Sequence, residues 1–263
     1  MGIFESVGKR THDWIVSFHE GLAFLGESAV CAVTAVFRPR QFRFGDAALA
    51  FQRATFDGLP ITTGIGFLLG VILAFQSAAA LQQFGVEVYI ADLLAIALFR
   101  ELGPIITAII LAGRSGSAFA AEIGIMKVNE ELDALTTMGL PPVRFLVLPR
   151  VAAAALAMPI LTVFAELAGL VGGAIVLEVM NVPTQVFWRH VMSTTNVFMI
   201  LLGLSKGAFF GMLVGLIGCS AGIRARKTSD GVGTAATAAV VGSIIAIAVS
   251  DGILAVLCYL WNI

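Results

Sequence analysis

The sequence predicts an all-α integral membrane protein with five transmembrane helices, an N-terminal interfacial helix and a short cytoplasmic helix between spans two and three. The 263 residues are 59% hydrophobic and 13% charged, whereas a soluble domain is about half apolar and about a quarter charged. The mean hydropathy is +0.96. Five apolar segments can each cross about 30 Å of hydrocarbon, which takes about 20 helical residues. Lys and Arg also gather in alternate connections between these segments, as in multi-pass membrane proteins.

The N-terminal segment Trp14–Val36 differs from the five spans because it is amphipathic. Its apolar face repeats at helical spacing and consists of Trp14, Phe18, Leu22, Leu25 and Ala29. Its acidic residues, Asp13, Glu20 and Glu27, line another face. A helix of this kind lies in the membrane interface, and a packed amphipathic transmembrane helix is the alternative. We therefore expect residues 1–58 to form a cytoplasmic and interfacial region and residues 59–263 to form the membrane domain.

The predicted spans are Leu59–Leu81, Leu93–Ala112, Val151–Leu177, Val197–Ala221 and Val232–Leu260. The second span can continue as a helix beyond its apolar part. Small residues recur every four positions in three places: Gly66, Gly70, Ala74 and Ala78; Gly116, Ala120 and Gly124; and Gly169 and Gly173. Ridges of small residues let helix backbones approach closely in lipid, so we expect these ridges to be packing surfaces.

A short helix is predicted between spans two and three, within "KVNEELDALTTMGLPPVRFLVLPR" (127–150). Asn129 is a candidate N-cap, and Glu130 and Glu131 in the first turn suit the helix dipole. Gly139 suits the C′ position, and the two prolines that follow prevent continuation. The predicted apolar face consists of Val128, Leu132, Leu135 and Met138. This helix either rests on the membrane or docks its apolar face into a groove on a soluble partner.

The basic residues predict the orientation. Thirteen of the sixteen Lys and Arg residues lie before the first span, between spans two and three, or between spans four and five. The other two connections, 82–92 and 178–196, contain only Arg189. If Trp14–Val36 lies flat, all thirteen lie on one side of the membrane. The N-terminus is then cytoplasmic and the C-terminus lies outside.

Five ionisable residues interrupt the apolar spans: Arg100, Glu101, Glu166, Lys206 and Asp251. Each costs at least about 2.5–3.5 kcal/mol at the centre of a membrane helix, so such residues usually face a cavity or a partner. Glu166, Lys206 and Asp251 can form a structural ion-pair network. Arg100 presents a forked set of donors that suits phosphate or carboxylate, and we expect it to have a functional rather than a structural role.

Pro104 follows the Arg100–Glu101 pair and cannot donate to the carbonyl of Arg100. We therefore expect a bend that leaves this acceptor available. Irregular backbone at membrane depth is tolerated only where protein or a water-lined cavity satisfies it. With Gln76 on the first span as a further polar group, these residues predict an internal cavity with polar anchoring points.

Several function classes are disfavoured. A net charge of −1 does not suit a nucleic-acid partner, and Cys31, Cys219 and Cys258 lack disulfide or metal-site spacing. "GRSG" (113–116) resembles the serine motif of intramembrane proteases, but no histidine lies within a span to act as base. Lys227-Thr228 lacks the preceding glycine of a P-loop, so we expect no cofactor in this chain and ATP binding by a separate subunit.

Three stretches together resemble the MlaE/YrbE permease family: "LFRELGPIITAIILAGRSGSAFAAEIGIMKVNEELDALTTMGLPPVRFLVLPR", "MPILTVFAELAGLVGG" and "GCSAGIRARKTSDGVGTAATAAVV". The resemblance covers about Leu59 to Leu257. It implies the membrane subunit of an ABC transporter that moves phospholipid between the inner and outer membranes and maintains outer-membrane lipid asymmetry. It further implies a homodimer with two cytoplasmic ATPases, a periplasmic ring of MCE-domain protein and a small STAS-domain subunit.

The resemblance also implies roles for particular residues. Arg100, Glu101 and Gln76 would face a lipid cavity between two permeases. The segment from Glu130 to Met138 would be the coupling helix in the ATPase groove, with contacts from Glu130, Glu131, Leu132, Leu135 and Met138. The EAA-loop pattern of bacterial ABC importers is present only with altered spacing, so it indicates position by analogy alone.

Two other functions remain open from the residues. One is an ion- or proton-coupled secondary transporter that uses Glu166, Lys206 and Asp251 as a relay; five spans without a recognisable inverted repeat count against it. The other is a membrane anchor for a soluble complex, which has no need of charges at membrane depth.

Overall fold

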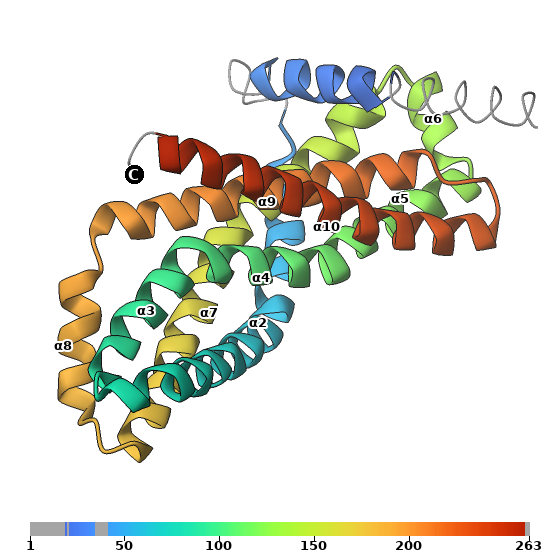
Figure 1. Cartoon of the computed structure of the whole chain (residues 1–263). Helices are drawn as coiled ribbons and strands as arrows, with labels where there is room; N and C mark the ends of the chain where they lie inside the picture. The colour runs from blue at the N-terminus through green and yellow to red at the C-terminus, as the bar shows by residue number, and fades with distance from the viewer. Residues whose placement is uncertain (1–18, 20, 35–41, 261–263) are drawn as a thin grey trace, which may run out of the picture.

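The computed structural model describes residues 19, 21–34 and 42–260 as a helical bundle with one further helix outside it (Figure 1). The bundle helices are α2 (Phe44–Leu81), α3 (Ile90–Ala97), α4 (Gly103–Leu111), α5 (Ser117–Val128), α6 (Glu131–Thr137), α7 (Leu148–Val179), α8 (Thr184–Thr194), α9 (Val197–Ile223) and α10 (Ser229–Leu260). Three π-helical turns join or precede them: η4 (Leu98–Leu102), η5 (Ala112–Gly116) and η6 (Val143–Val147). Two short 3₁₀ turns, η2 (Gln82–Phe84) and η3 (Glu87–Tyr89), connect α2 to α3.

The five predicted spans are confirmed as five helices long and apolar enough to cross a membrane. Each of these helices extends beyond the predicted apolar segment at one or both ends. The second span runs without a break from Glu87 to Val128 through two π turns, which confirms its expected continuation. The first span, α2, begins at Phe44 and not at the predicted Leu59, and Arg43 pairs with Asp46 in its first turn.

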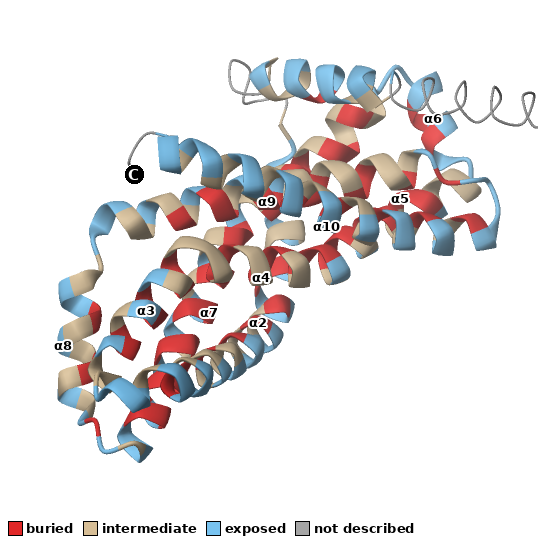
Figure 2. Ribbon diagram, viewed as in Figure 1, coloured by how far each residue is buried: buried red, intermediate tan, exposed pale blue. Residues whose placement is uncertain are grey.

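Of the five spans, α7 is the most buried and α10 the least, as the colours of the two helices show (Figure 2). In their most apolar windows, 61% of the α7 residues are buried but only 11% of the α10 residues. Large apolar side chains on the outer faces, such as Leu68, Leu201 and Ile245, are more than half exposed. Such surfaces suit lipid or a second protein chain rather than water.

The predicted small-residue ridges are packing surfaces. A Cβ on Gly66 or Gly70 of α2 would overlap backbone atoms of Ala165 or Gly169 on α7, so these helices touch through their main chains. The ridge from Gly116 likewise faces α9: a Cβ on Gly218 would lie 2.6 Å from the Gly116 carbonyl oxygen. Gly218 and Gly222 form the α9 side of this contact, since a Cβ on Gly222 would lie 2.8 Å from the Ala120 carbonyl oxygen. A second glycine ridge of α9, which was not predicted, packs against α7 and consists of Gly207, Gly211 and Gly215.

The helix over Gly21–Thr34 lies on the outside of the bundle (Figure 1, blue at the top). The remainder of the predicted Trp14–Val36 helix, including Trp14 and Phe18, falls outside the described residues. Leu22 and Leu25 of the predicted apolar face are exposed, whereas Phe24 and Cys31 pack against the bundle core and Ser28 is buried. An exposed apolar face is compatible with a helix in the membrane interface, which stays a prediction.

The helix α8 was not predicted. A cluster of polar contacts holds it against α3: His190 Nδ1 lies 3.1 Å from Asp92 Oδ2, and the Thr194 hydroxyl donates to Asp92 Oδ1 at 2.5 Å. Tyr89 packs edge-on against the His190 ring. The length of apolar segments does not predict α8, because this helix is short and amphipathic.

Candidate functional site

The candidate site begins at the π turn η4, which contains the Arg100–Glu101 pair. The Gly103 N–H donates to the carbonyl of Leu98, five residues earlier, which is the spacing of a π turn. Pro104 then removes the donor that the Arg100 carbonyl would otherwise receive. Lys206 Nζ on α9 donates to that carbonyl at 3.4 Å. The predicted availability of this acceptor is therefore confirmed, and a side chain from another span uses it.

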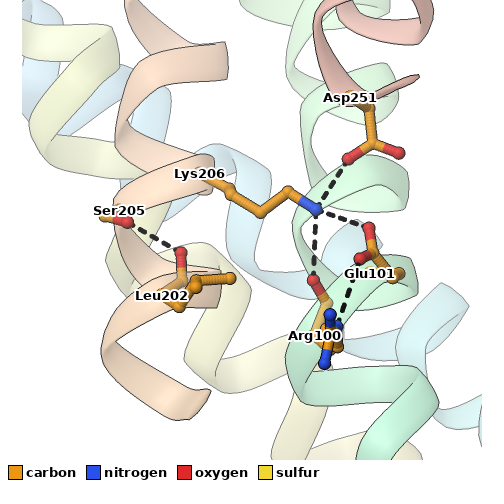
Figure 3. Close-up of polar contacts among 6 residues, drawn as sticks. All are labelled: Arg100, Glu101, Leu202, Ser205, Lys206 and Asp251. Carbon is orange, nitrogen blue, oxygen red and sulfur yellow. Dashed lines mark hydrogen bonds and ion pairs between the residues drawn. The ribbon is translucent and has the colours of Figure 1, made fainter. Parts of the chain in front are cut away.

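Lys206 lies at the centre of a charge cluster that joins three spans (Figure 3). Its Nζ is 2.5 Å from Glu101 Oε2 on η4 and 2.9 Å from Asp251 Oδ1 on α10. The Lys206 side chain is only 4% exposed, whereas Glu101 is 31% exposed and Asp251 17% exposed. The Asp251 contact is an ion pair by distance, without hydrogen-bond geometry. The two carboxylates together supply the opposite charge that a buried ammonium requires.

Arg100 lies at the exposed edge of this cluster. Its Nε is 3.7 Å from Glu101 Oε1, and 37% of its side chain is exposed (Figure 3). With Glu101, Lys206 and Asp251 it forms a group of two cations and two anions. The guanidinium is held near Glu101, and its exposed part can offer donors to a phosphate or carboxylate ligand.

The structure corrects the predicted network of Glu166, Lys206 and Asp251. Lys206 and Asp251 do meet, but Glu101 takes the third place. Glu166 is 1% exposed on α7 and forms no hydrogen bond or ion pair with the described residues. It packs against Gly103, where a Cβ would lie 2.8 Å from Glu166 Oε1. The backbone of the π turn therefore occupies the space beside Glu166.

Gln76 does not join the cluster. It is exposed on α2 and forms no hydrogen bond with the described residues. The buried ridge of α2, which includes Ala74 and Ala78, faces the neighbouring helices instead. A role of Gln76 at a lipid cavity therefore stays a prediction.

A second candidate region is α6, the predicted helix between spans two and three. Its apolar residues Leu132 and Leu135 are buried in the core of the chain, 7% and 8% exposed, whereas Met138 is 65% exposed. The prediction that Leu132 and Leu135 insert into a partner is therefore wrong, because they anchor α6 to the core of its own chain. The outward surface of α6 and its flanks contains Glu130, Glu131, Asp133, Thr136, Thr137 and Met138.

The predicted ends of α6 are partly confirmed. Asn129 does not cap this helix: it ends α5, and Glu130 precedes α6 in a left-handed conformation with φ 61°. The C-terminus is as predicted, with Gly139 at φ 73°. The Gly139 N–H donates to Thr136 O, and the Leu140 N–H donates to Leu135 O. These two bonds form a Schellman motif.

Two lysines join α6 and its neighbours to the connection between α9 and α10. Lys227 Nζ lies 2.6 Å from Asp133 Oδ2 of α6, and Lys127 Nζ donates to the Ile223 carbonyl at the end of α9. The hydrogen bond to Asp133 and the charge of that carboxylate raise the pKa of Lys227. A displacement of α6 can thus reach α10, the helix that carries Asp251.

Comparison with known proteins adds independent findings. The family model described as permease MlaE matches residues 49–257. A probable ABC transporter permease of Rickettsia felis is 33% identical over 255 residues, 95% of each chain. A probable ABC transporter permease of Synechocystis is 40% identical over 194 residues, 73% of this chain and 72% of the relative. The intermembrane phospholipid transport system permease protein MlaE of Haemophilus influenzae is 34% identical over 196 residues, 74% of this chain and 75% of the relative.

Proposed function

The chain belongs to the MlaE permease family, and from this premise we propose that, as the membrane subunit of an ABC transporter, it moves phospholipid between the inner and outer membranes of a bacterium. In doing so it maintains the lipid asymmetry of the outer membrane. The observation that carries the proposal is a charge cluster at membrane depth with one partly exposed arginine. An arginine that is both held in place and accessible can bind a lipid phosphate.

The lipid site is completed by a second copy of the chain. Arg100 and Glu101 lie at the surface of a single chain, 37% and 31% exposed, and Gln76 is exposed on the first span. A homodimer encloses these polar groups between apolar helix faces and leaves a cavity for acyl chains. Glu101 holds the Arg100 side chain and Lys206 binds the Arg100 carbonyl, so the guanidinium loses little conformational freedom when it binds a phosphate.

Transport is driven by a cytoplasmic ATPase that contacts the exposed surface of α6. Glu130, Glu131 and Met138 make this contact, while Leu132 and Leu135 transmit the movement into the permease core. The ion pair of Lys227 with Asp133 carries the same movement to α10. Because α10 is one helix from Ser229 to Leu260, its displacement alters the contact between Asp251 and Lys206.

The orientation follows from the basic residues. The ends of the spans that carry α6 and the connection between α9 and α10 face the cytoplasm, and the C-terminus faces the periplasm. A periplasmic ring of MCE-domain protein receives the lipid, and a STAS-domain subunit binds the ATPase. The chain itself needs no cofactor.

The lipid role is tested with Arg100→Ala in the intact complex, with Arg189→Ala on α8 as a control for the loss of one positive charge. We expect Arg100→Ala to lower the phospholipid that co-purifies, measured by mass spectrometry, by at least about threefold. Arg189→Ala should retain the wild-type amount. Normal lipid content in Arg100→Ala, together with full restoration of the outer-membrane barrier in cells, would refute the role. Lipid transport that follows the proton gradient and ignores ATP would favour the secondary transporter instead.

The ATPase contact is tested with Met138→Asp, and Met192→Asp on α8 is the control. Both methionines are largely exposed, 65% and 75%, so neither change should disturb folding. We expect Met138→Asp to weaken the co-purification of the ATPase because it places a charge in a desolvated contact. Undiminished ATPase association and transport would contradict the proposed contact surface.

A further inference from the structure

The helix 21–34 covers a largely apolar groove that lies away from the charge cluster. The groove has a volume of about 530 Å³ and lies between this helix, the end of α9 and the start of α10. Its walls are largely apolar and include Phe24, Leu216 and Ala238. None of the four residues of the charge cluster lines it. The groove is therefore separate from the site around Arg100.

The groove continues under the same helix. A neighbouring cavity of about 230 Å³ shares Leu25 and Leu216 with it and extends along α7 to Val151. One buried polar group lines this second part: Ser28 is 7% exposed, and its hydroxyl has no hydrogen-bond partner among the described residues. A buried hydroxyl normally has a partner, so a ligand with an acceptor within the apolar part would satisfy Ser28.

The mouth of the groove is cationic. Arg224 and Arg226 both line it, and both are exposed. Neither forms an ion pair with an acidic side chain in the described part of the chain. Arg224 reaches toward the start of the helix, since a Cβ on Gly21 would lie 3.7 Å from Arg224 Nη2. Two guanidinium groups without an acidic partner among residues 19, 21–34 and 42–260 thus lie at the entrance of a long apolar groove.

We propose that this groove binds an anionic phospholipid, with the head-group phosphate at Arg224 and Arg226 and an acyl chain beneath the helix 21–34. The arrangement matches an anionic amphiphile at both ends: charge-assisted donors at the mouth and a continuous apolar wall behind it. An ester carbonyl of the lipid accepts from Ser28. Because the proposed orientation places the connection between α9 and α10 on the cytoplasmic side, the bound lipid belongs to the cytoplasmic leaflet. The site itself does not depend on that orientation. The bound lipid acts as a brace that attaches the helix 21–34 to the junction of α9 and α10.

The test is native mass spectrometry of the full-length chain, titrated with dioleoyl phosphatidylglycerol or with dioleoyl phosphatidylethanolamine. We expect the wild type to bind phosphatidylglycerol more tightly than phosphatidylethanolamine. The double variant Arg224→Ala/Arg226→Ala should weaken phosphatidylglycerol binding about tenfold, or about 1.4 kcal/mol. The zwitterionic lipid should bind equally to both proteins. Arg224→Lys/Arg226→Lys should recover most of the affinity because it restores the charge.

Two further variants keep the result specific. Ala238→Trp narrows the groove without touching either arginine and should also weaken phosphatidylglycerol binding. Arg189→Ala removes an arginine elsewhere and should not. All measurements are repeated with Arg100→Ala present. If Arg100→Ala leaves lipid binding unchanged, the proposed transport site is refuted. The groove is still tested separately by the variants at Arg224, Arg226 and Ala238.

Three results would overturn the proposal. The first is equal phosphatidylglycerol affinity in the wild type, the double alanine variant and Ala238→Trp. The second is a loss of the dimer mass in Ala238→Trp with lipid binding unchanged, because the occupant is then a second copy of the chain. The third is phosphatidylglycerol binding that is seen only after removal of residues 1–18, because the N-terminal segment then fills the groove.

Discussion

Replacement of Lys206 by Met removes the central cation of the charge cluster and retains a side chain of similar length. In the wild type, Lys206 Nζ faces Glu101 Oε2 at 2.5 Å, Asp251 Oδ1 at 2.9 Å and the Arg100 carbonyl at 3.4 Å. In the described part of the chain, the variant leaves two carboxylates with Arg100 as their one neighbouring cation. The substitution therefore creates an uncompensated negative charge at membrane depth.

The expected loss of stability follows from burial. Removal of one partner from a buried ion pair costs about 3–5 kcal/mol. Glu101 and Asp251 keep 31% and 17% of their side chains exposed, so screening places the cost near the lower end, about 3 kcal/mol. For a chain of this size one kcal/mol lowers the melting temperature by about 2–4 °C. Lys206→Met should therefore lower it by about 6–12 °C.

A double-mutant cycle separates this charge effect from lost packing. Lys206→Met combined with Asp251→Asn leaves Arg100 and Glu101 as a neutral pair, so the double variant should regain about 1–2 kcal/mol relative to the sum of the single changes. Thermal unfolding of the detergent-solubilised chain measures all three variants. Lys227→Met, at an ion pair whose side chains are 50% and 61% exposed, is the control and should change the melting temperature little. The reasoning is refuted if Lys206→Met melts within about 2 °C of the wild type or if the cycle shows no coupling.

Two further predictions use positions on α2 and α6. Gly70→Ala should destabilise the chain by about 1–3 kcal/mol because the added Cβ overlaps the backbone of α7. Gly64→Ala on the same helix is the control: its Cβ meets nothing within 4 Å, so this change should be neutral or stabilising. Equal melting temperatures of the two variants would show that α2 and α7 are not in main-chain contact. The raised pKa of Lys227 means that its pair with Asp133 stabilises the chain fully below the ordinary lysine pKa of about 10.4 and is lost as pH rises through the higher folded value. The small difference in melting temperature between the wild type and Lys227→Met should therefore close only above about pH 10.4, and a difference that stays constant up to pH 12 would contradict the assignment.

The two regions of the site were predictable to different degrees. The charges at membrane depth could be identified because each one interrupts an apolar run. The Arg100 carbonyl could be identified as an acceptor without its usual helical donor because proline has no N–H. The partner of Lys206 could not be identified from the sequence. Glu101, Glu166 and Asp251 are equivalent as carboxylates, and only the packing of η4 and α10 against α9 decides that Glu101 and Asp251 reach the ammonium.

The residues of α6 show the same division. Glycine and proline after Met138 set where the helix ends, because a positive φ and a missing N–H are local properties. Helical spacing also shows that Leu132 and Leu135 share a face. It does not show whether that face meets a partner or the chain's own core, since both surfaces exclude water alike. The buried positions of these two leucines settle the question in favour of the core.

The sequence by itself determined the membrane class, the five spans, the small-residue ridges and the ionisable residues within the spans. These are consequences of composition and of spacing along a single helix. Only the tertiary structure decided that Glu101 rather than Glu166 pairs with Lys206, that α8 lies against α3, and that the helix 21–34 covers a groove with a cationic mouth. These features join residues about a hundred or more positions apart, or residues on separate helices. Their positions depend on the orientation of each helix about its own axis and on the distance between neighbouring helix backbones. Glycine ridges and π turns set both of these in the folded chain.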